Sequence, residues 1–166
     1  MESKKMKRSE LLAFFGGLNA VGELEGVKFA YAVVRNKNNC KAEVEALNEA
    51  QKPPEDFLKL QGEHRELLEK HCDKDKDGKP VVKVLSPNVT QYAGIAENKA
   101  YKKEFDALEK KNKKLMDARE KQMKDYEKLL GEDVTVNLHL IDFETIPEGI
   151  TPAQLELIFP MMKEEK

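Results

Sequence analysis

The sequence has no tryptophan, only 7% aromatic residues and only two cysteines among its 166 residues. Cys40 and Cys72 lie far apart and form no CxxC pair, which excludes a disulfide framework and predicts two reduced thiols. No stretch approaches the roughly 18 apolar residues of a membrane-spanning helix, and the first residues contain no apolar run of signal-peptide length. We therefore expect an intracellular protein without a membrane segment.

A strong charge imbalance is also missing, because 29 basic side chains stand against 31 acidic ones. This balance gives no general reason to expect nucleic acid or an anionic membrane as a partner. Two segments carry a local excess of one sign of charge, and both are interpreted as solvated surface. They are a basic start (Lys4, Lys5, Lys7, Arg8) and an acidic segment over 132–165 (Glu132, Asp133, Asp142, Glu144, Glu148, Glu156, Glu164, Glu165), which holds Lys163 as its single base.

The motifs of common enzyme classes are absent. The chain has no GxSxG, no phosphate-binding GxxxxGK[ST] and no GxGxxG, and neither cysteine lies in a recognisable nucleophile motif. Carboxylates are plentiful but scattered over polar helix faces. We therefore expect no catalytic residues and no cofactor.

The most regular pattern covers residues 98–130 and predicts one continuous helix of roughly 50 Å. Residues recur there at steps of four and three, which is a heptad seam: Tyr101, Phe105, Leu108, Asn112, Leu115, Arg119, Gln122, Tyr126 and Leu129. The polar members of the seam favour packing against another helix of the same chain over a stand-alone dimer. Gly131 is expected to end the helix.

Three further helices are predicted before this one and one after it. Ser9 is a plausible N-cap for a short helix whose end Gly16 and Gly17 weaken. Residues 27–34 suit a strand by propensity, but we expect a helix because 41–52 is strongly helical and no turn separates the two pieces. Pro53-Pro54 must interrupt it, and a helix follows to residue 72 with Pro54 as its first residue. Residues 151–154 (TPAQ) form a capping box that predicts the last helix.

Two strands are expected. Residues 81–85 form a short one, followed by an irregular connection over 86–96, and 134–141 alternates apolar and polar side chains. A single strand needs a partner. For 134–141 the partner could be the strand at 81–85, a segment near the N-terminus, or another subunit, and the last alternative would give a homodimer.

The fold class predicted from these elements is mainly α with a small β component (α+β). We expect one domain over 1–166, built as a long antiparallel helical hairpin with short strands at its tip and base. The arms cover about 27–72 and 98–130, and the base consists of 1–26 and 131–166.

Metal sites are poorly supported. Asp73, Asp75 and Asp77, followed by Gly78, match the first half of a calcium loop, but the twelfth position is Val84 where a bidentate glutamate is needed. A charged turn that enters a strand is the favoured interpretation. His64 and His71 lie about 10 Å apart on a helix, too far to share one zinc ion even with Cys72 nearby.

The densest basic cluster is Lys110, Lys111, Lys113 and Lys114 in the long helix. Acidic residues interleave with lysines throughout 99–128, which favours i, i+4 pairs over a phosphate-binding stripe. Nucleic acid is therefore not the expected partner.

The order of five segments resembles an uncharacterised family of small charged helical proteins encoded by tailed phages and prophages. The segments are 29–36 (FAYAVVRN), 43–50 (EVEALNEA), 75–79 (DKDGK), 134–141 (VTVNLHLI) and 150–155 (ITPAQL). The resemblance implies a phage origin and a helical-hairpin shape, and it supplies no catalytic residue.

Together these observations predict a non-enzymatic, protein-binding phage accessory, assembly or virion-associated protein, located in the host cytoplasm or in the virion. Its partner would be a phage structural protein or a host protein. The alternatives are a phage inhibitor of a host defence or host nucleic-acid machine, and a weak nucleic-acid-binding protein. The surfaces expected to contact a partner are Lys110, Lys111, Lys113 and Lys114 on the long helix, and Glu144 and Glu148 in the acidic segment.

Overall fold

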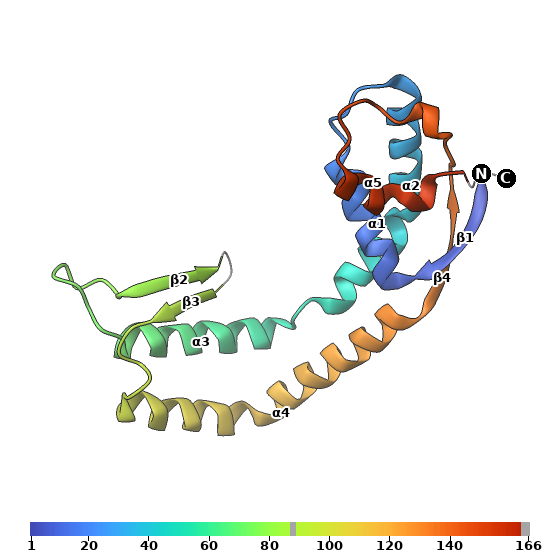
Figure 1. Cartoon of the computed structure of the whole chain (residues 1–166). Helices are drawn as coiled ribbons and strands as arrows, with labels where there is room; N and C mark the ends of the chain where they lie inside the picture. The colour runs from blue at the N-terminus through green and yellow to red at the C-terminus, as the bar shows by residue number, and fades with distance from the viewer. Residues whose placement is uncertain (87–88, 164–166) are drawn as a thin grey trace. The chain divides into compact units, whose positions relative to one another are not determined.

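A computed structural model describes residues 1–86 and 89–163 (Figure 1). Asn88, Glu164 and Glu165 lie outside the described residues. The main elements, in chain order, are β1 (Glu2–Lys7), α1 (Arg8–Ala20), α2 (Val27–Gln51), α3 (Glu55–His71), β2 (Val82–Ser86), β3 (Val89–Tyr92), α4 (Lys99–Gly131), β4 (Asp133–Leu138) and α5 (Pro152–Ile158). This order confirms the mainly α class with a small β component.

The chain divides into two compact units. Unit 1 consists of residues 1–52 and 123–166, and unit 2 consists of residues 53–122. Each unit has its own two-stranded antiparallel sheet, β1–β4 in unit 1 and β2–β3 in unit 2. Whether the two units act as one domain, as expected, stays a prediction.

Unit 1 contains a hydrophobic core in which α1 packs against both α2 and α5, while β4 packs on α2 (Figure 1). Phe14, Leu18, Phe29, Leu138 and Ile158 are buried at its centre. The helix α1 continues past Gly16 and Gly17 to Ala20. A Cβ atom on Gly17 would lie 2.5 Å from the Cβ of Leu157, so glycine permits the close approach of α5.

The segment 27–34 is helical, as expected, and α2 extends from it without interruption to Gln51. Phe29, Ala32 and Val33 are buried, whereas Ala30 and Val34 are exposed. The buried face also includes Asn36, a polar residue that the periodicity of apolar side chains does not reveal.

The partner of β4 is the N-terminal segment, one of the three alternatives left open. β1 pairs antiparallel with β4 in a register that places Met6 opposite Val134 and Lys4 opposite Val136. The basic start is largely solvent-exposed, as interpreted from sequence, and it also forms polar contacts at the surface. Lys5 pairs with Asp133 at 2.9 Å, and the Lys7 ammonium donates to the carbonyl of Gly131 at the end of α4.

Two asparagines of α2 bind the backbone at and beyond the end of β4. The amide nitrogen of Asn36 donates to the carbonyl of His139 at 3.0 Å, and its oxygen accepts the His139 N–H at 2.7 Å. Asn39, one turn further along, donates to the carbonyl of Asn137 at 2.7 Å. The amides thus satisfy backbone groups that a third strand would otherwise bind.

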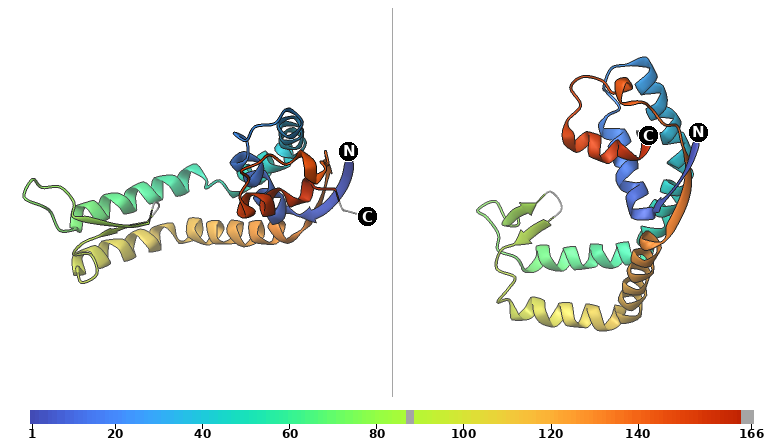
Figure 2. Two further views of the ribbon diagram at one scale, coloured as in Figure 1. Left: turned by 45° about the horizontal axis from the view of Figure 1, so that its top comes forward. Right: turned by 45° about the vertical axis from the view of Figure 1, so that its right-hand side comes forward.

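Unit 2 contains α3 and the part of α4 up to residue 122, which run side by side and antiparallel (Figure 2). All seam positions of α4 within the unit are buried or half-buried, from Tyr101 to Gln122. The predicted packing of the long helix on another helix of the same chain is confirmed for this stretch. Pro53 and Pro54 separate α2 from α3 as expected, but Pro54 is the N-cap and Glu55 the first helical residue.

The connection predicted to be irregular over 86–96 contains a strand. β3 pairs antiparallel with β2, with Val82 opposite Tyr92 and Val84 opposite Thr90, and the register shifts at a bulge between Val84 and Ser86. The strand expected at 81–85 therefore exists, and its partner is its immediate neighbour in sequence. We call β2 and β3 together the hairpin.

Candidate functional site

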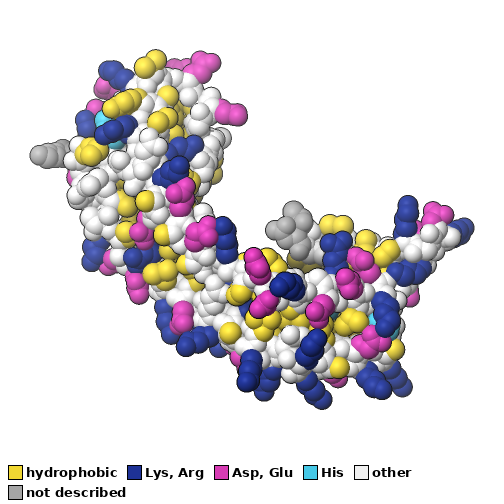
Figure 3. All heavy atoms as spheres, turned by 180° about the vertical axis from the view of Figure 1, so that it is seen from behind, with side chains coloured by type: hydrophobic (Ala, Val, Ile, Leu, Met, Phe, Trp, Pro, Cys, Tyr) yellow, Lys and Arg dark blue, Asp and Glu magenta, His cyan; other side chains and the backbone are white. Residues whose placement is uncertain are grey.

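The hairpin exposes most of its apolar side chains. Val84, Leu85 and Val89 keep 68%, 54% and 50% of their surface accessible, and every residue of β2 is exposed. Single exposed apolar residues are ordinary on protein surfaces, whereas several gathered on one small element are typical of sites where another molecule binds. Figure 3 shows hydrophobic side chains on the surface in this part of the chain.

The edges of the hairpin are also open. Within the described residues, the backbone groups of 82–86 and 89–92 make no hydrogen bond beyond the ladder that joins the two strands. An isolated two-stranded sheet is marginally stable in water, and a strand edge with unpaired N–H and C=O groups is a template for another strand. Exposed valines and leucine beside such an edge are typical of a surface that accepts an extended peptide.

A groove of about 760 Å³ lies beside the hairpin within unit 2. It is lined by Leu68 of α3, by Val81, Val82 and Tyr92 at the base of the hairpin, and by Ile95. The Tyr92 hydroxyl lies 3.5 Å from the Glu69 carboxylate, which orients the base of the hairpin on α3. The groove is apolar with a polar margin, which suits a partner side chain more than a charged small molecule.

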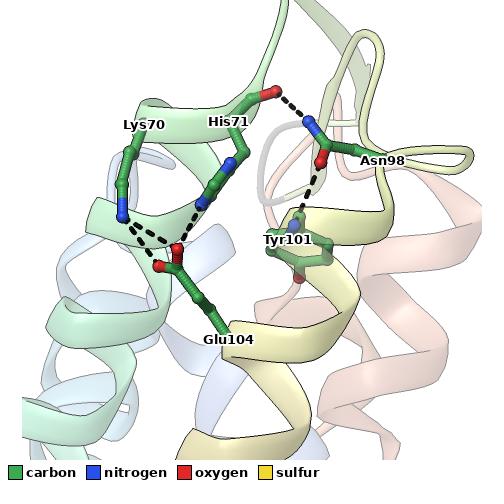
Figure 4. Close-up of polar contacts among 5 residues, drawn as sticks. All are labelled: Lys70, His71, Asn98, Tyr101 and Glu104. Carbon is green, nitrogen blue, oxygen red and sulfur yellow. Dashed lines mark hydrogen bonds and ion pairs between the residues drawn. The ribbon is translucent and has the colours of Figure 1, made fainter.

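A dense polar cluster joins the end of α3 to the start of α4 (Figure 4). Lys70 and His71 both point to Glu104, with nitrogen–oxygen distances of 2.8 and 3.3 Å. The Asn98 oxygen accepts the N–H of Tyr101 at 3.0 Å and so caps α4, while its amide nitrogen donates to the carbonyl of His71 at 3.0 Å. The side chains of this cluster are thus engaged in capping and pairing the two helix ends.

His64 and Tyr101 form a second polar contact between the same helices. The His64 Nε2 atom lies 2.8 Å from the Tyr101 hydroxyl, and the imidazole packs on the ring of Phe105 with centroids 4.6 Å apart. Burial lowers the pKa of His64, opposed by the charge of Glu109, and burial also raises the pKa of Tyr101. The neutral forms of both side chains are therefore favoured in the folded state.

The carboxylates of the calcium-loop sequence are not brought together. The Asp75 oxygen accepts the N–H groups of Asp77 and Lys79, at 2.9 and 2.8 Å, and Gly78 adopts a φ of 75°. The segment is thus the charged turn preferred from sequence. Over residues 1–86 and 89–163, no group of three His, Cys, Asp or Glu side chains is placed to hold a metal ion. The calcium-loop aspartates and the set His64, His71 and Cys72 therefore form no such group.

Both cysteines are free and buried, in agreement with the prediction of unpaired thiols. Cys40 lies in the core of unit 1, where burial raises its pKa to about 11. A thiol with so high a pKa is almost entirely protonated at neutral pH and is a poor nucleophile.

The residues expected to contact a partner fall into different units. Lys110, Lys111, Lys113 and Lys114 are all exposed on the part of α4 that belongs to unit 2. Glu144 and Glu148 are exposed in unit 1, in the segment between β4 and α5. Their binding role stays a prediction.

The exposed hairpin was missed by sequence reasoning. Residues 89–92 (VTQY) follow the apolar segment 81–85 after a short connection containing Pro and Asn, which is a recognisable hairpin signal. The asparagines of α2 had no such signal, because only the fold brings them to β4.

Comparison of the chain with protein-family models, with curated proteins and with solved structures finds no match. Among the described residues, no helix is both long enough and apolar enough to cross a membrane.

Proposed function

We propose that the protein is a non-enzymatic protein-binding module that docks its partner on the hairpin of unit 2. The observation that carries this proposal is the combination of exposed Val84, Leu85 and Val89 with strand edges whose backbone groups make no other hydrogen bond in the described chain. A partner that adds an extended segment would gain backbone hydrogen bonds along the edge and apolar contacts on its face. The groove beside the hairpin would receive a side chain of that segment.

The polar clusters support binding over catalysis. Lys70, His71, Glu104 and Asn98 are engaged in the ends of two helices, and Cys40 is a protonated core thiol. A catalytic constellation needs groups directed at a site where substrate can lie. The role of a phage accessory, assembly or virion-associated protein is part of the same proposal, and the order of sequence segments described above supports it.

Affinity capture from infected or lysogenic host lysate, read by mass spectrometry, tests this proposal when hairpin variants are compared with wild type. The double variant Val84→Thr, Leu85→Ser removes the two most exposed apolar side chains of β2 and keeps a β-branched residue at position 84. We expect it to lose the partner that wild type retains. A matched control, Val27→Gln with Val34→Gln, removes two exposed apolar side chains from α2 in unit 1 and should retain the partner.

The identity of the captured protein separates the alternatives. Tail or capsid proteins would support the assembly role, and one host enzyme or nuclease would favour the inhibitor. A second copy of the chain would appear as a dimer in light scattering that the double variant converts to a monomer. Equal capture by wild type and the double variant, or a reproducible enzymatic turnover abolished by one substitution, would contradict the proposal.

A further inference from the structure

The lysines of α4 follow an eleven-residue repeat. Lys99, Lys102 and Lys103 recur as Lys110, Lys113 and Lys114, Asp106 recurs as Asp117, and a third repeat begins at Lys121. Eleven residues are just over three turns of α-helix, so equivalent positions shift by only about 20° around the axis. The repeated lysines therefore lie on one face of the helix.

This face points away from α3. The seam residues of α4, such as Tyr101 and Phe105, contact His64 of α3 on the opposite side. The repeated lysines are all exposed, and Figure 3 shows Lys and Arg side chains gathered along α4. We call Lys99, Lys102, Lys103, Lys110, Lys113, Lys114 and Lys121 the lysine face.

The helix separates charges that are mixed in the sequence. Glu104 turns toward α3 to meet Lys70, and Glu109 lines a pocket with His64 on the seam side. Lys111 likewise leaves the lysine face and lines a groove with Glu63 and Glu66 of α3. The acidic residues that remain near the lysine face are Asp106, Asp117 and Glu120, so the face is basic although the helix sequence is mixed.

The lysine face is not neutralised by ion pairs within the helix. In the described part of the chain, none of the lysines of this face forms an ion pair with a carboxylate. Lys41 with Glu45 in α2, and Arg65 with Glu69 in α3, do form i, i+4 pairs. The i, i+4 pairs expected from the mixed charges of 99–128 are thus not found at the lysines of this face.

We propose that the lysine face binds the phosphate backbones of a nucleic-acid duplex without reading its base sequence. Successive lysine clusters are roughly 16 Å apart along the helix. A B-form duplex makes one turn in about 34–36 Å and has two backbones, so a helix lying along its axis meets a backbone about every 17 Å on average. Asp106 and Asp117 fall between the clusters and would lie over grooves.

The composition of the face points to backbone contacts only. Lysine is a flexible point charge that suits phosphate, whereas direct base recognition uses Arg, Asn or Gln in fixed geometry. The face has no aromatic side chain on which unpaired bases could stack, which disfavours single strands. This binding is independent of the proposed role of the hairpin, because it uses another surface of unit 2.

Fluorescence anisotropy of the full chain with a labelled duplex of about 20 base pairs tests the proposal. We expect a dissociation constant of roughly 10 µM or tighter at about 50 mM salt, weakening steeply as salt is raised. The variant Lys110→Gln, Lys113→Gln, Lys114→Gln should weaken binding by at least about tenfold and reduce the salt slope by about 2 to 3. Glutamine keeps helix propensity close to that of lysine, and circular dichroism verifies the fold.

The matched control removes three exposed lysines from α3 and the 73–79 turn, with Lys59→Gln, Lys76→Gln and Lys79→Gln. It should change binding by less than about threefold, because overall charge acts only weakly at a distance in salt. Equal losses in both triple variants, or no duplex binding at low salt, would overturn the proposal. Binding to a single strand or to polyglutamate as tight as to the duplex would also overturn it and would indicate an acidic protein partner.

Discussion

The two small sheets of this protein are treated in opposite ways by the chain around them. In unit 1, the sheet β1–β4 buries Val136 and Leu138 in the core, and the asparagines of α2 bind the backbone at 137 and 139. In unit 2, the hairpin leaves Val84 and Leu85 exposed, and its strand edges have no described partner. Two two-stranded sheets in one chain thus differ in whether their apolar face and their free backbone groups are covered.

This difference indicates that the sheet β1–β4 contributes to the stability of the fold, whereas the hairpin is available to bind a partner. A sheet stabilises a fold when its apolar face is removed from water and its backbone groups are paired. β4 meets both conditions within the chain, so substitutions there should unfold the protein. The hairpin meets neither on its outer side, so substitutions there should affect a partner more than the fold.

The largest expected effect is the contrast between two leucines, one in each sheet. Leu138→Ala removes a fully buried side chain and should lower the free energy of unfolding by about 3 kcal/mol. Leu85→Ala acts on a side chain that is 54% exposed and should cost less than about 0.5 kcal/mol. Urea unfolding followed by circular dichroism measures both. Similar losses for the two variants would remove the distinction between the sheets.

A second substitution removes the side chain that hydrogen-bonds the backbone just beyond the end of β4. Asn36→Leu should lower the free energy of unfolding by about 2 to 3 kcal/mol, because the N–H and C=O of His139 would lose their partners at a part-buried site. Asn38→Leu, at an exposed position of the same helix, is the control and should cost less than about 0.5 kcal/mol. A small effect of Asn36→Leu would mean that water replaces the amide.

Asn98 offers a smaller effect in unit 2. Asn98→Ala removes the cap of α4 and the hydrogen bond to the carbonyl of His71, and should cost about 1 to 2 kcal/mol in urea unfolding. Asn98→Asp keeps the capping oxygen and adds a charge that the helix N-terminus favours, so it should recover much of the loss. Equal destabilisation by the two variants would assign the effect to the bond with His71.

The smallest predicted effect is a pH dependence that belongs to unit 2. Burial lowers the pKa of His64 below its ordinary value of 6.5, so protons bind the unfolded state first as pH falls. Stability should therefore be complete above about pH 6.5 and decline as pH falls from there to the lowered pKa. Lys70, followed by His71, lowers the pKa of Glu104 below 4.5, which gives a further loss at lower pH.

Substituting His64 by Gln tests the first of these two steps. Glutamine keeps a group able to hydrogen-bond Tyr101 but does not titrate, so His64→Gln should reduce the decline of the unfolding free energy as pH falls below about 6.5. An unchanged slope in this variant would assign the pH dependence to other groups.

The sequence was most informative where one periodic pattern ran without interruption. The heptad seam placed the long helix at 98–130, and the structure has it at Lys99–Gly131. The capping box at Thr151 likewise placed α5, because the local hydrogen bonds that start a helix are encoded by neighbouring residues.

The sequence was least informative where pairing decides the structure. β1 contributes Met6 as its single buried residue, so it lacks the apolar alternation that identifies strands. Its existence depends on β4, more than a hundred residues later in the chain. The exposure of the hairpin is also invisible in the sequence, since Val82, Val84 and Leu85 look like core residues until the fold shows what covers them.

The charge pattern of α4 lies between these cases. The eleven-residue repeat of lysines is present in the sequence, but it acquires meaning only when the segment is known to be one continuous helix. In that helix, Glu104 and Glu109 lie on the side that faces α3, while the repeated lysines lie on the solvent-exposed side. Counting charges along the sequence hides this separation.

Hydrogen–deuterium exchange of the full chain, alone and with the captured partner, can distinguish a covered β4 from a hairpin that is open until a partner binds. Alone, the amides of β4 should exchange only through extensive unfolding, and those of the hairpin should exchange much faster. The partner should slow exchange over 82–86 and 89–92 and leave β4 unchanged. A hairpin already as protected as β4, or protection by the partner that excludes the hairpin, would contradict the account.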